Sequence, residues 1–289
     1  MTVQISGTAV NGQEGRVGTG SGVVYDNLGH IITNDHVVAA GSSFEIVLSD
    51  GRVYPAELVG TDPTTDLAVL SITAQDLAAI ALGDSDVLTV GDPAVAVGSP
   101  LGLDGGPSLT VGVISAFGRL VQTDATTRLY GMLQTDAPIT SGSSGGALVD
   151  GAGQLIGITT AVGVSDVGIE GIGFATPVEV VTRVANEIID GGTASAAYIG
   201  IRGDTSFADT TDGGSAPTGV VVVSVDPGTA AATAGIAAGD VIAAINGDTV
   251  KTMNELVALL RRYGAGEMIE VTLDNGTLVD VTLGQRPTA

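Results

Sequence analysis

Short apolar runs separated by turn residues dominate the sequence from about residue 17 to residue 176 and limit the folds that it can adopt. Val, Ile and Leu gather in short stretches, and glycine, aspartate or asparagine ends each stretch after roughly 8–12 positions. Representative runs are Gly22-Val-Val-Tyr, Phe44-Glu-Ile-Val-Leu, Leu67-Ala-Val-Leu, Ala94-Val-Ala-Val and Leu155-Ile-Gly-Ile-Thr. This pattern predicts an all-β sandwich or barrel rather than alternating β and α units.

Composition narrows the class of protein further. At 289 residues, 44% of them hydrophobic, the chain can fill one large core or two ordinary ones. Its formal charge of −22 disfavours nucleic acid and anionic lipid as partners, because no basic stripe neutralises their phosphates. The absence of cysteine and the presence of only two histidines exclude thiolate sites and multi-histidine metal sites. We therefore expect no metal and no organic cofactor.

The N-terminus, Met1-Thr-Val-Gln-Ile, carries neither a charged segment followed by an apolar one nor an apolar run of the ~18 residues that cross a bilayer. Two expectations follow. Either the protein is cytoplasmic, or the chain as given lacks its export segment or anchor.

A helix and a linker are predicted after the β-rich part. Thr176 as N-cap, Pro177 at the first helical position and Glu179 resemble a helix start, and Gly191-Gly192 marks its end. We place the first domain at 1–190, a linker at 191–197 and a second domain at 198–289. The second domain is predicted to contain strands and one helix opened by a capping box from Thr252 to Glu255. The predicted strands are Gly219–Val225, Asp240–Ile245, Met268–Leu273 and Thr277–Leu283.

His36, Asp66 and Ser144, in this order along the chain, form a candidate catalytic group. A serine hydroxyl needs a neighbouring base, and that base needs an orienting carboxylate. Of the two histidines, His30 sits in a turn and is expected to be solvated, whereas the apolar flanks of His36 predict a partly buried imidazole. Asp66 begins an apolar strand, where a charge needs a hydrogen-bonding partner. Each motif alone fits an ordinary core histidine or a strand-capping aspartate.

The nucleophile candidate is Ser144, in the segment Thr140-Ser-Gly-Ser-Ser-Gly-Gly. Glycines on both sides allow a sharp turn and a close approach of substrate. The amides of Gly142 and Ser144, helped by Ser143, could then meet on the oxyanion of a tetrahedral intermediate. Taken alone, such a segment is also typical of an ordinary loop.

Together with their flanking segments, these motifs resemble the HtrA (high-temperature-requirement A, Deg) serine proteases from about residue 17 to the end of the chain. The matching segments are Gly20-Ser-Gly-Val-Val, Ile32-Thr-Asn-Asp-His-Val-Val, Asp66-Leu-Ala-Val-Leu, Gly98-Ser-Pro-Leu-Gly-Leu, Gly112-Val-Ile-Ser-Ala, Gln134-Thr-Asp-Ala, Gly142-Ser-Ser-Gly-Gly and Gly171-Ile-Gly-Phe-Ala. The resemblance implies a mainly β fold, with two six-stranded trypsin-like barrels followed by a PDZ domain.

The resemblance also implies roles for individual residues. His36 is the expected general base, Asp66 its orienter and Ser144 the nucleophile, with Gly142 and Ser143 shaping the oxyanion loop. The chain departs from the family's usual residues at four positions: Ser143 replaces Asn, Ala147 replaces Pro, Asp35 replaces Asn and His30 replaces Tyr. None of these removes a catalytic group, and Asp35 could raise the pKa of His36.

Two binding sites follow from the same resemblance. Ile139, Val162 and Gly163 match the primary specificity pocket and predict a preference for a small or medium aliphatic residue before the scissile bond; ordinary barrel packing is the alternative. Tyr198, Ile199, Gly200 and Ile201 match the carboxylate-binding loop of a PDZ domain. The apolar residues Ile201, Leu256 and Leu260 are expected to receive a hydrophobic C-terminal side chain.

The resemblance therefore implies an ATP-independent endopeptidase that cleaves unfolded or damaged proteins and is regulated by peptide C-termini. It implies a homotrimer and an extracytoplasmic location, in the cell envelope or periplasm, with an export signal or membrane anchor on the native protein. A chaperone-like scaffold that binds clients with little turnover is the main alternative, and a hydrolase of small esters is a second one.

Overall fold

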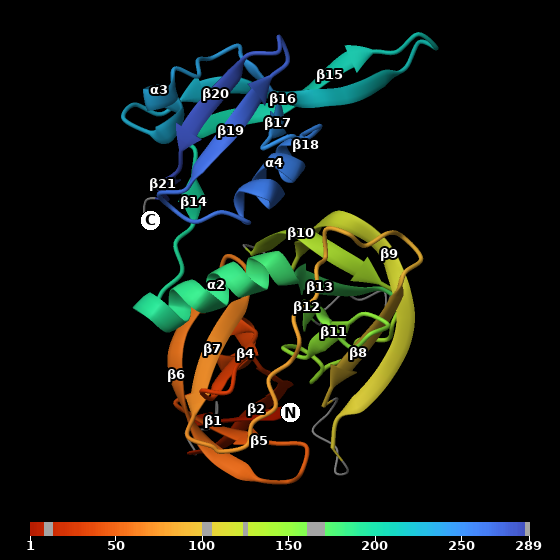
Figure 1. Ribbon diagram of the computed structural model, residues 1–289, viewed down its shortest axis with the longest axis vertical. Coiled ribbons are helices and arrows are strands. Elements are labelled where there is room, and N and C mark those ends of the chain that lie inside the picture. The colour runs from red at the N-terminus through yellow and green to blue at the C-terminus, as the bar shows by residue number, and fades with distance from the viewer. Residues whose placement is uncertain (9–13, 100–105, 124–126, 161–170, 287–289) are drawn as a thin grey trace. The chain divides into compact units, whose positions relative to one another are not determined.

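A computed structural model describes residues 1–8, 14–99, 106–123, 127–160 and 171–286 of the chain. It divides into two compact units, Met1–Ala194 and Ser195–Ala289, and the division falls inside the predicted linker, 191–197. Both units are built mainly from strands (Figure 1), which confirms the predicted fold class. Among the described residues, no helix has both the length and the apolar character that crossing a membrane requires.

The first sheet of the first unit has seven strands rather than the six predicted for a barrel. Its order is β2-β1-β5-β6-β7-β4-β3. The strands are β1 (Thr2–Thr8), β2 (Glu14–Ser21), β3 (Val23–Val24), β4 (His30–Thr33), β5 (Ser43–Val47), β6 (Val53–Asp62) and β7 (Leu67–Ile72).

The extra strand arises from a bend. The two end strands, β2 and β3, are separated by Gly22 alone, so one bent segment supplies both edges of the sheet. A Cβ atom at Gly22 would lie 2.9 Å from Cγ2 of Ile31 and 3.0 Å from Cγ2 of Val3. Glycine is therefore required where the chain turns against the interior of the sheet.

The second sheet is a closed six-stranded barrel in the order β10-β13-β12-β11-β8-β9, as predicted. Its strands are β8 (Pro93–Gly98), β9 (Ser108–Gln122), β10 (Arg128–Thr135), β11 (Ala147–Val149), β12 (Leu155–Thr160) and β13 (Gly173–Pro177). All neighbouring strands are antiparallel.

Helix α2 (Val178–Gly191) joins the two sheets into one unit. It packs on β6 and β7 of the first sheet and on β12 and β13 of the barrel (Figure 1). Its buried face, which includes Val181, Val184 and Ile188, belongs to one apolar cluster with Val69 of the first sheet and Ile158 of the barrel. This shared core fixes the junction of the two sheets, where the candidate site lies.

The start of α2 differs from the prediction. Pro177 is the N-cap and helical geometry begins at Val178, with no side-chain cap. Thr176 is still part of β13, and its buried hydroxyl donates to the carbonyl oxygen of Thr65 at 3.4 Å, so it is not available as a cap. The predicted end is confirmed, because Gly192 caps the helix in the left-handed conformation.

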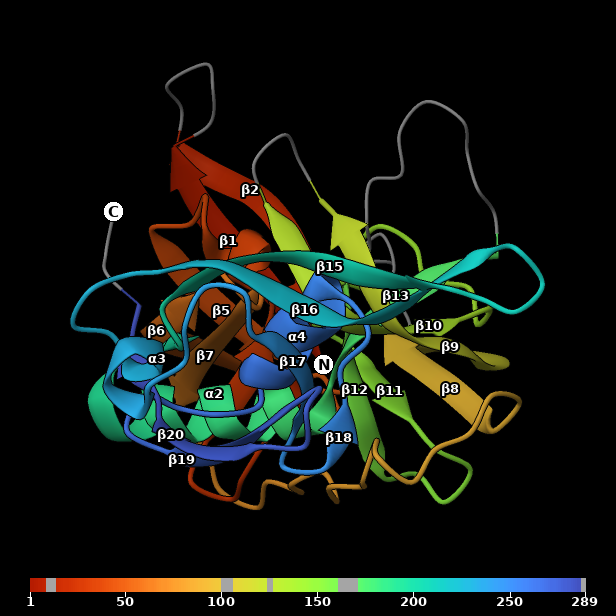
Figure 2. The same ribbon diagram turned by 90° about the horizontal axis from the view of Figure 1, so that it is seen from above.

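The second unit contains a six-stranded sheet in the order β15-β16-β17-β19-β20, with β18 paired to β17. Its strands are β15 (Ile201–Asp209), β16 (Ser215–Val225), β17 (Val241–Ile245), β18 (Asp248–Thr249), β19 (Met268–Leu273) and β20 (Leu278–Thr282), and β14 (Ala197–Tyr198) pairs with β21 (Gly284–Gln285). Strands β15 and β16 form a long hairpin (Figure 2).

Two helices complete the second unit, α3 (Ala230–Ala234) and α4 (Met253–Leu260). The predicted capping box at the start of α4 is confirmed. The Thr252 side chain accepts from the Glu255 amide, and the Glu255 carboxylate accepts from the Thr252 amide.

Candidate active site

His36 lies on α1 (Asp35–Val38), a single turn that directly follows β4. The next two residues, Val37 and Val38, are buried in the core of the first sheet and hold this turn in place. The imidazole itself keeps 46% of its side-chain surface exposed. One side of the ring is therefore anchored while another is open to a reactant.

Asp66 meets the anchored side of His36. Its carboxylate oxygens lie 2.8 and 2.9 Å from Nδ1 of His36, and Oδ1 also accepts the backbone N–H of His36 at 3.0 Å. Only 8% of the Asp66 side chain is exposed. Both the ring and the main chain of His36 are thus held by one buried carboxylate.

The backbone of Asp66 takes a conformation that non-glycine residues seldom adopt, with φ of +58°. The amide side chain of Asn34 donates to the Asp66 carbonyl oxygen at 2.8 Å. Asn34 is itself fully buried, and it also donates to Oγ1 of Thr160 at 3.3 Å. This contact helps to hold the turn that aims the carboxylate at His36.

The charges around His36 favour its protonated form. Burial alone lowers the pKa of His36, but the hydrogen bond and charge of Asp66, with the charge of Asp35, raise it above its ordinary value of 6.5. The pKa of Asp35 is raised mainly by burial and also by the charges of Asp66 and Asp62, against a hydrogen bond from Thr61. The predicted influence of Asp35 on His36 therefore has the expected sign.

Ser144 follows a tight turn made by Thr140–Ser143. The Ser143 amide donates to the Thr140 carbonyl oxygen at 2.9 Å, and Gly142 at the third position has φ of +90°. A positive φ at this position defines a type II turn and favours glycine. After the turn, the carbonyl oxygen of Ser144 accepts the Ser21 amide at 2.8 Å.

The glycines next to these residues bring the two sheets together. Gly20 lies against both the Val37 side chain and the Ser144 carbonyl oxygen, and a Cβ atom there would crowd both. A Cβ atom at Gly145 would overlap the Ser21 carbonyl oxygen and Oγ1 of Thr33. His36 and Asp66 of the first sheet and Ser144, which precedes β11 of the barrel, thus come from facing parts of the junction.

The predicted specificity pocket is only partly within the described residues. Ile139 is half-buried and packs against the core of the barrel, next to Gly173 at the start of β13, where a Cβ atom would lie 2.5 Å from Cδ1 of Ile139. Val162 and Gly163 lie outside the described residues.

The predicted peptide-binding loop spans the end of β14 and the start of β15, at the edge of the second unit's sheet. Gly200 has φ of +88°, and a Cβ atom there would overlap the side chain of Thr229. The hydroxyl of Tyr198 donates to the carboxylate of Asp226 at 2.6 Å. Of the three expected groove residues, Leu256 is fully buried in the core, whereas Ile201 and Leu260 each keep 9% of their surface exposed.

His30 differs from its expected solvated state. Only 18% of its side chain is exposed, and Nδ1 lies 2.6 Å from the carboxylate of Asp26. The same carboxylate accepts the backbone N–H groups of Leu28 and His30, so it orders the whole turn and draws the imidazole onto it.

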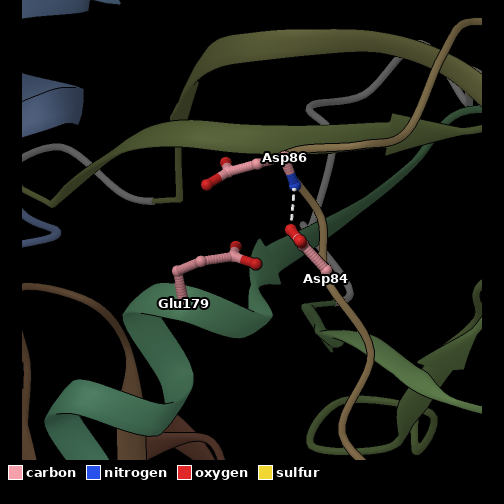
Figure 3. A group of neighbouring side chains, drawn as sticks. All are labelled: Asp84, Asp86 and Glu179. Carbon is pink, nitrogen blue, oxygen red and sulfur yellow. Dashed lines mark hydrogen bonds between the residues drawn. The ribbon is translucent and has the colours of Figure 1, made fainter.

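An acidic group lies apart from these residues, where Glu179 in the first turn of α2 faces Asp84 and Asp86 (Figure 3). Asp84 accepts the Asp86 amide at 2.9 Å, and the Glu179 carboxylate accepts from the amide and hydroxyl of Ser85. These bonds tie the 84–86 segment to α2, and they account for the close approach of the three carboxylates.

Sequence reasoning missed the residues that support the site. Asn34, Ser21 and Thr159 are buried residues, and each donates a side-chain hydrogen bond to a carbonyl oxygen in the segments that carry Asp66 or Ser144. Two of them stand inside segments singled out above, Gly20-Ser-Gly-Val-Val and Ile32-Thr-Asn-Asp-His. For Ser21, a polar residue between two glycines was the available signal.

Comparison with known proteins agrees with this geometry. Residues 20–158 match the model of a trypsin-like peptidase domain, and residues 221–273 match that of a PDZ domain. The fold and site thus define a trypsin-like peptidase domain followed by a PDZ domain.

Among its relatives, the chain is 40% identical over 271 residues to the serine protease Do-like HtrA of Lactococcus lactis subsp. cremoris, covering 88% of this chain and 67% of the relative. It is 39% identical over 273 residues to the periplasmic serine endoprotease DegP of Escherichia coli, covering 91% and 56%. A solved structure titled HtrA-type protease AlgW with tripeptide matches with a TM-score of 0.73 and 35% identity, covering 100% and 94%.

The chain belongs to the HtrA/Deg family of serine proteases. It spans 64% of the length of one relative, the putative serine protease HhoB of Synechocystis, and 56% of the Escherichia coli DegP.

Proposed function

We propose that this chain is an ATP-independent serine endopeptidase that cleaves unfolded or damaged proteins through an acyl-enzyme. The observation that carries the proposal is the buried Asp66 carboxylate, which holds both Nδ1 and the backbone amide of His36. The imidazole of His36 is therefore kept in one orientation, which a general base needs through several proton transfers.

The roles follow from the chemistry of each group. Because Asp66 accepts a hydrogen bond from the Nδ1–H group of His36, the proton stays on Nδ1 and the other ring nitrogen can take the proton of the Ser144 hydroxyl. Ser144 then attacks the peptide carbonyl, and the charged imidazole is stabilised by Asp66. The backbone amides of Gly142 and Ser144 donate to the oxyanion, and Ser143 lies between them on the same loop. His36 returns its proton to the leaving amine, and a water molecule releases the acyl group by the same route.

Substrate preference is proposed to follow from an apolar primary pocket formed by Ile139 with Val162 and Gly163. Such a pocket accepts a small or medium aliphatic side chain and leaves a charged one without a partner. Mapping the cleavage sites in an unfolded protein tests this, since a dominant preference for Arg or Lys would contradict it.

We propose that the second unit binds peptide C-termini and regulates cleavage. The loop Tyr198, Ile199, Gly200 and Ile201 would hold the terminal carboxylate, and the peptide would add as a strand beside β15. The positive φ of Gly200 and the edge position of β15 support this placement. We further propose a homotrimer outside the cytoplasm, in keeping with relatives named as periplasmic proteases.

The test is hydrolysis of unfolded β-casein by the chain and by Ser144→Ala, with and without peptides that end in a hydrophobic residue. We expect cleavage that vanishes in Ser144→Ala and persists in the control Ser42→Ala, an exposed serine of the same unit. Peptides with a free carboxylate should stimulate cleavage and their amides should not. If the chain binds casein without cleaving it and Ser144 resists fluorophosphonate labelling, the scaffold alternative replaces the enzyme.

A further inference from the structure

Ser21 has no role in the mechanism above, yet it contacts both residues that carry the proposed oxyanion donors. It is the last residue of β2 and has no exposed surface. Its hydroxyl donates to the Gly142 carbonyl oxygen at 2.7 Å, and its backbone amide donates to the Ser144 carbonyl oxygen at 2.8 Å. One residue therefore anchors the turn on both sides of Ser143.

The Ser21 hydroxyl is used in both directions. Besides donating to Gly142, it accepts the backbone N–H of Ser99 at 2.7 Å. Ser99 follows β8 of the barrel, so the hydroxyl connects the first sheet, the barrel and the turn before Ser144. A methyl group at this place would leave the buried Ser99 amide and the partly buried Gly142 carbonyl oxygen without these partners, and an unpaired polar group withdrawn from water is costly.

The backbone on each side of Ser21 is built for this approach. Gly20 contacts Val37 and the Ser144 carbonyl oxygen, and Gly22 packs against the interior of the first sheet. Oγ1 of Thr33 donates to the Ser21 carbonyl oxygen at 2.7 Å. The glycines of the motif Gly20-Ser-Gly thus allow the close packing that places the Ser21 hydroxyl against Gly142 and Ser99.

We infer that Ser21 is a positioning residue for the oxyanion loop. By holding the carbonyl groups of Gly142 and Ser144, it fixes the peptide planes next to the amides that face the developing charge. Such donors act because they are oriented before the reaction starts, and a loop free to rotate loses that advantage. The inference rests on the proposed function, since it assigns Ser21 a part in the same reaction.

Steady-state cleavage of an internally quenched casein-derived peptide by Ser21→Ala tests the inference, with Thr33→Val as the matched control. Thr33→Val removes a hydrogen bond of the same length from the same residue but leaves the Gly142 carbonyl bound. We expect kcat of Ser21→Ala to fall by about 10- to 100-fold, less than the 10²–10³ typical of removing a donor itself, with little change in KM. The rate of Ser144 labelling by a fluorophosphonate should fall in parallel.

Two further readouts distinguish a loss of the positioning role of Ser21 from a general loss of structure in the variants. The pH midpoint of kcat/KM should stay unchanged in Ser21→Ala, because the surroundings of His36 are intact. Ser21→Cys keeps a weak donor and acceptor and should give an intermediate kcat, which keeps the test valid if Ser21→Ala folds poorly.

The outcomes are distinct. If the unmodified chain cleaves the peptide and Ser21→Ala or Ser21→Cys does so as fast as Thr33→Val, the role of Ser21 is overturned and the protease stands. If the unmodified chain neither cleaves the peptide nor reacts with the fluorophosphonate, the proposed function falls and the role of Ser21 falls with it.

Discussion

The buried carboxylate of Asp66 accepts two hydrogen bonds from one residue, His36, through its ring and through its backbone amide. The pairing bridges 30 positions of sequence and depends on a turn in which Asp66 has a positive φ. Changes to this pair should therefore affect catalysis through the tautomer of the ring, separately from the fold.

Asp66→Asn is expected to lower kcat by about 10³–10⁴-fold with little loss of structure. Asparagine tolerates a positive φ, but its amide N–H groups would face Nδ1 and favour the wrong imidazole tautomer. Asp76→Asn is the matched control, because Asp76 is exposed and has φ of +56°. Peptide hydrolysis and circular dichroism measure the two effects, and equal activity of both variants would contradict the assignment.

The pH profile should report the charges around His36. The base must be neutral, so kcat/KM rises as pH passes the pKa of His36, and this midpoint is expected above the ordinary value of 6.5. Asp35→Asn removes one of the negative charges that raise this pKa, so the midpoint should move to lower pH. Glu45→Gln, on the exposed side of β5, should leave it in place. An unchanged midpoint in Asp35→Asn would show that Asp35 does not act on His36.

Gly145→Ala tests how closely the nucleophile turn must approach β2. Gly153 has nearly the same φ, +81° against +83°, but nothing lies within 4 Å of a Cβ atom there. Gly153→Ala should cost about 1–2 kcal/mol of unfolding free energy through its backbone alone. Gly145→Ala should cost about 1–3 kcal/mol more, because its methyl group overlaps Ser21 and Thr33. Urea denaturation measures both, and equal costs would mean that the turn shifts freely.

Thr252→Ala removes half of the capping box of α4. We expect the free energy that protects the α4 amides from hydrogen exchange to fall by about 1 kcal/mol. The amides of β12, in the other unit, serve as an internal control and should not change. Thr249→Ala, an exposed threonine before the helix, is the matched variant. If α4 keeps its protection in Thr252→Ala, the cap contributes nothing to this helix.

The two helix starts show where sequence reasoning succeeds and where it fails. Thr176 and Thr252 each precede a glutamate by three residues, and this spacing predicts an N-cap at both positions. At Thr252 both bonds of the capping box form, and the Glu255 carboxylate accepts the Lys251 amide as well, all within the first helical turn and the residue before it. At Thr176 the strand continues and its hydroxyl is taken by Thr65, while Ser85 takes the carboxylate of Glu179. Those competitors lie about 100 positions away in the chain and leave no local trace.

The same limit applies to the site. His36, Asp66 and Ser144 could be selected because their chemistry restricts the residue types and because each sits in an extended motif. Ser21 and Asn34 use ordinary polar side chains on partners far away in sequence, 121 positions from Ser21 to Gly142. Short apolar runs and turn residues predicted a sandwich or barrel, but they could not show that a bend at Gly22 would divide one strand into two.

That bend has a consequence for the proposed function, in which the chain acts on unfolded polypeptides. A sheet with bare ends is a template on which sticky extended segments can assemble. In the first unit, the barrel is closed and the terminal strands β2 and β3 of the other sheet run into each other at Gly22. The sheet of the second unit instead ends on two separate strands, β15 and β20, and the proposed peptide site lies at β15. Under the proposed function, a polypeptide would pair with a strand edge of the second unit and be cut by the residues His36, Asp66 and Ser144 of the first.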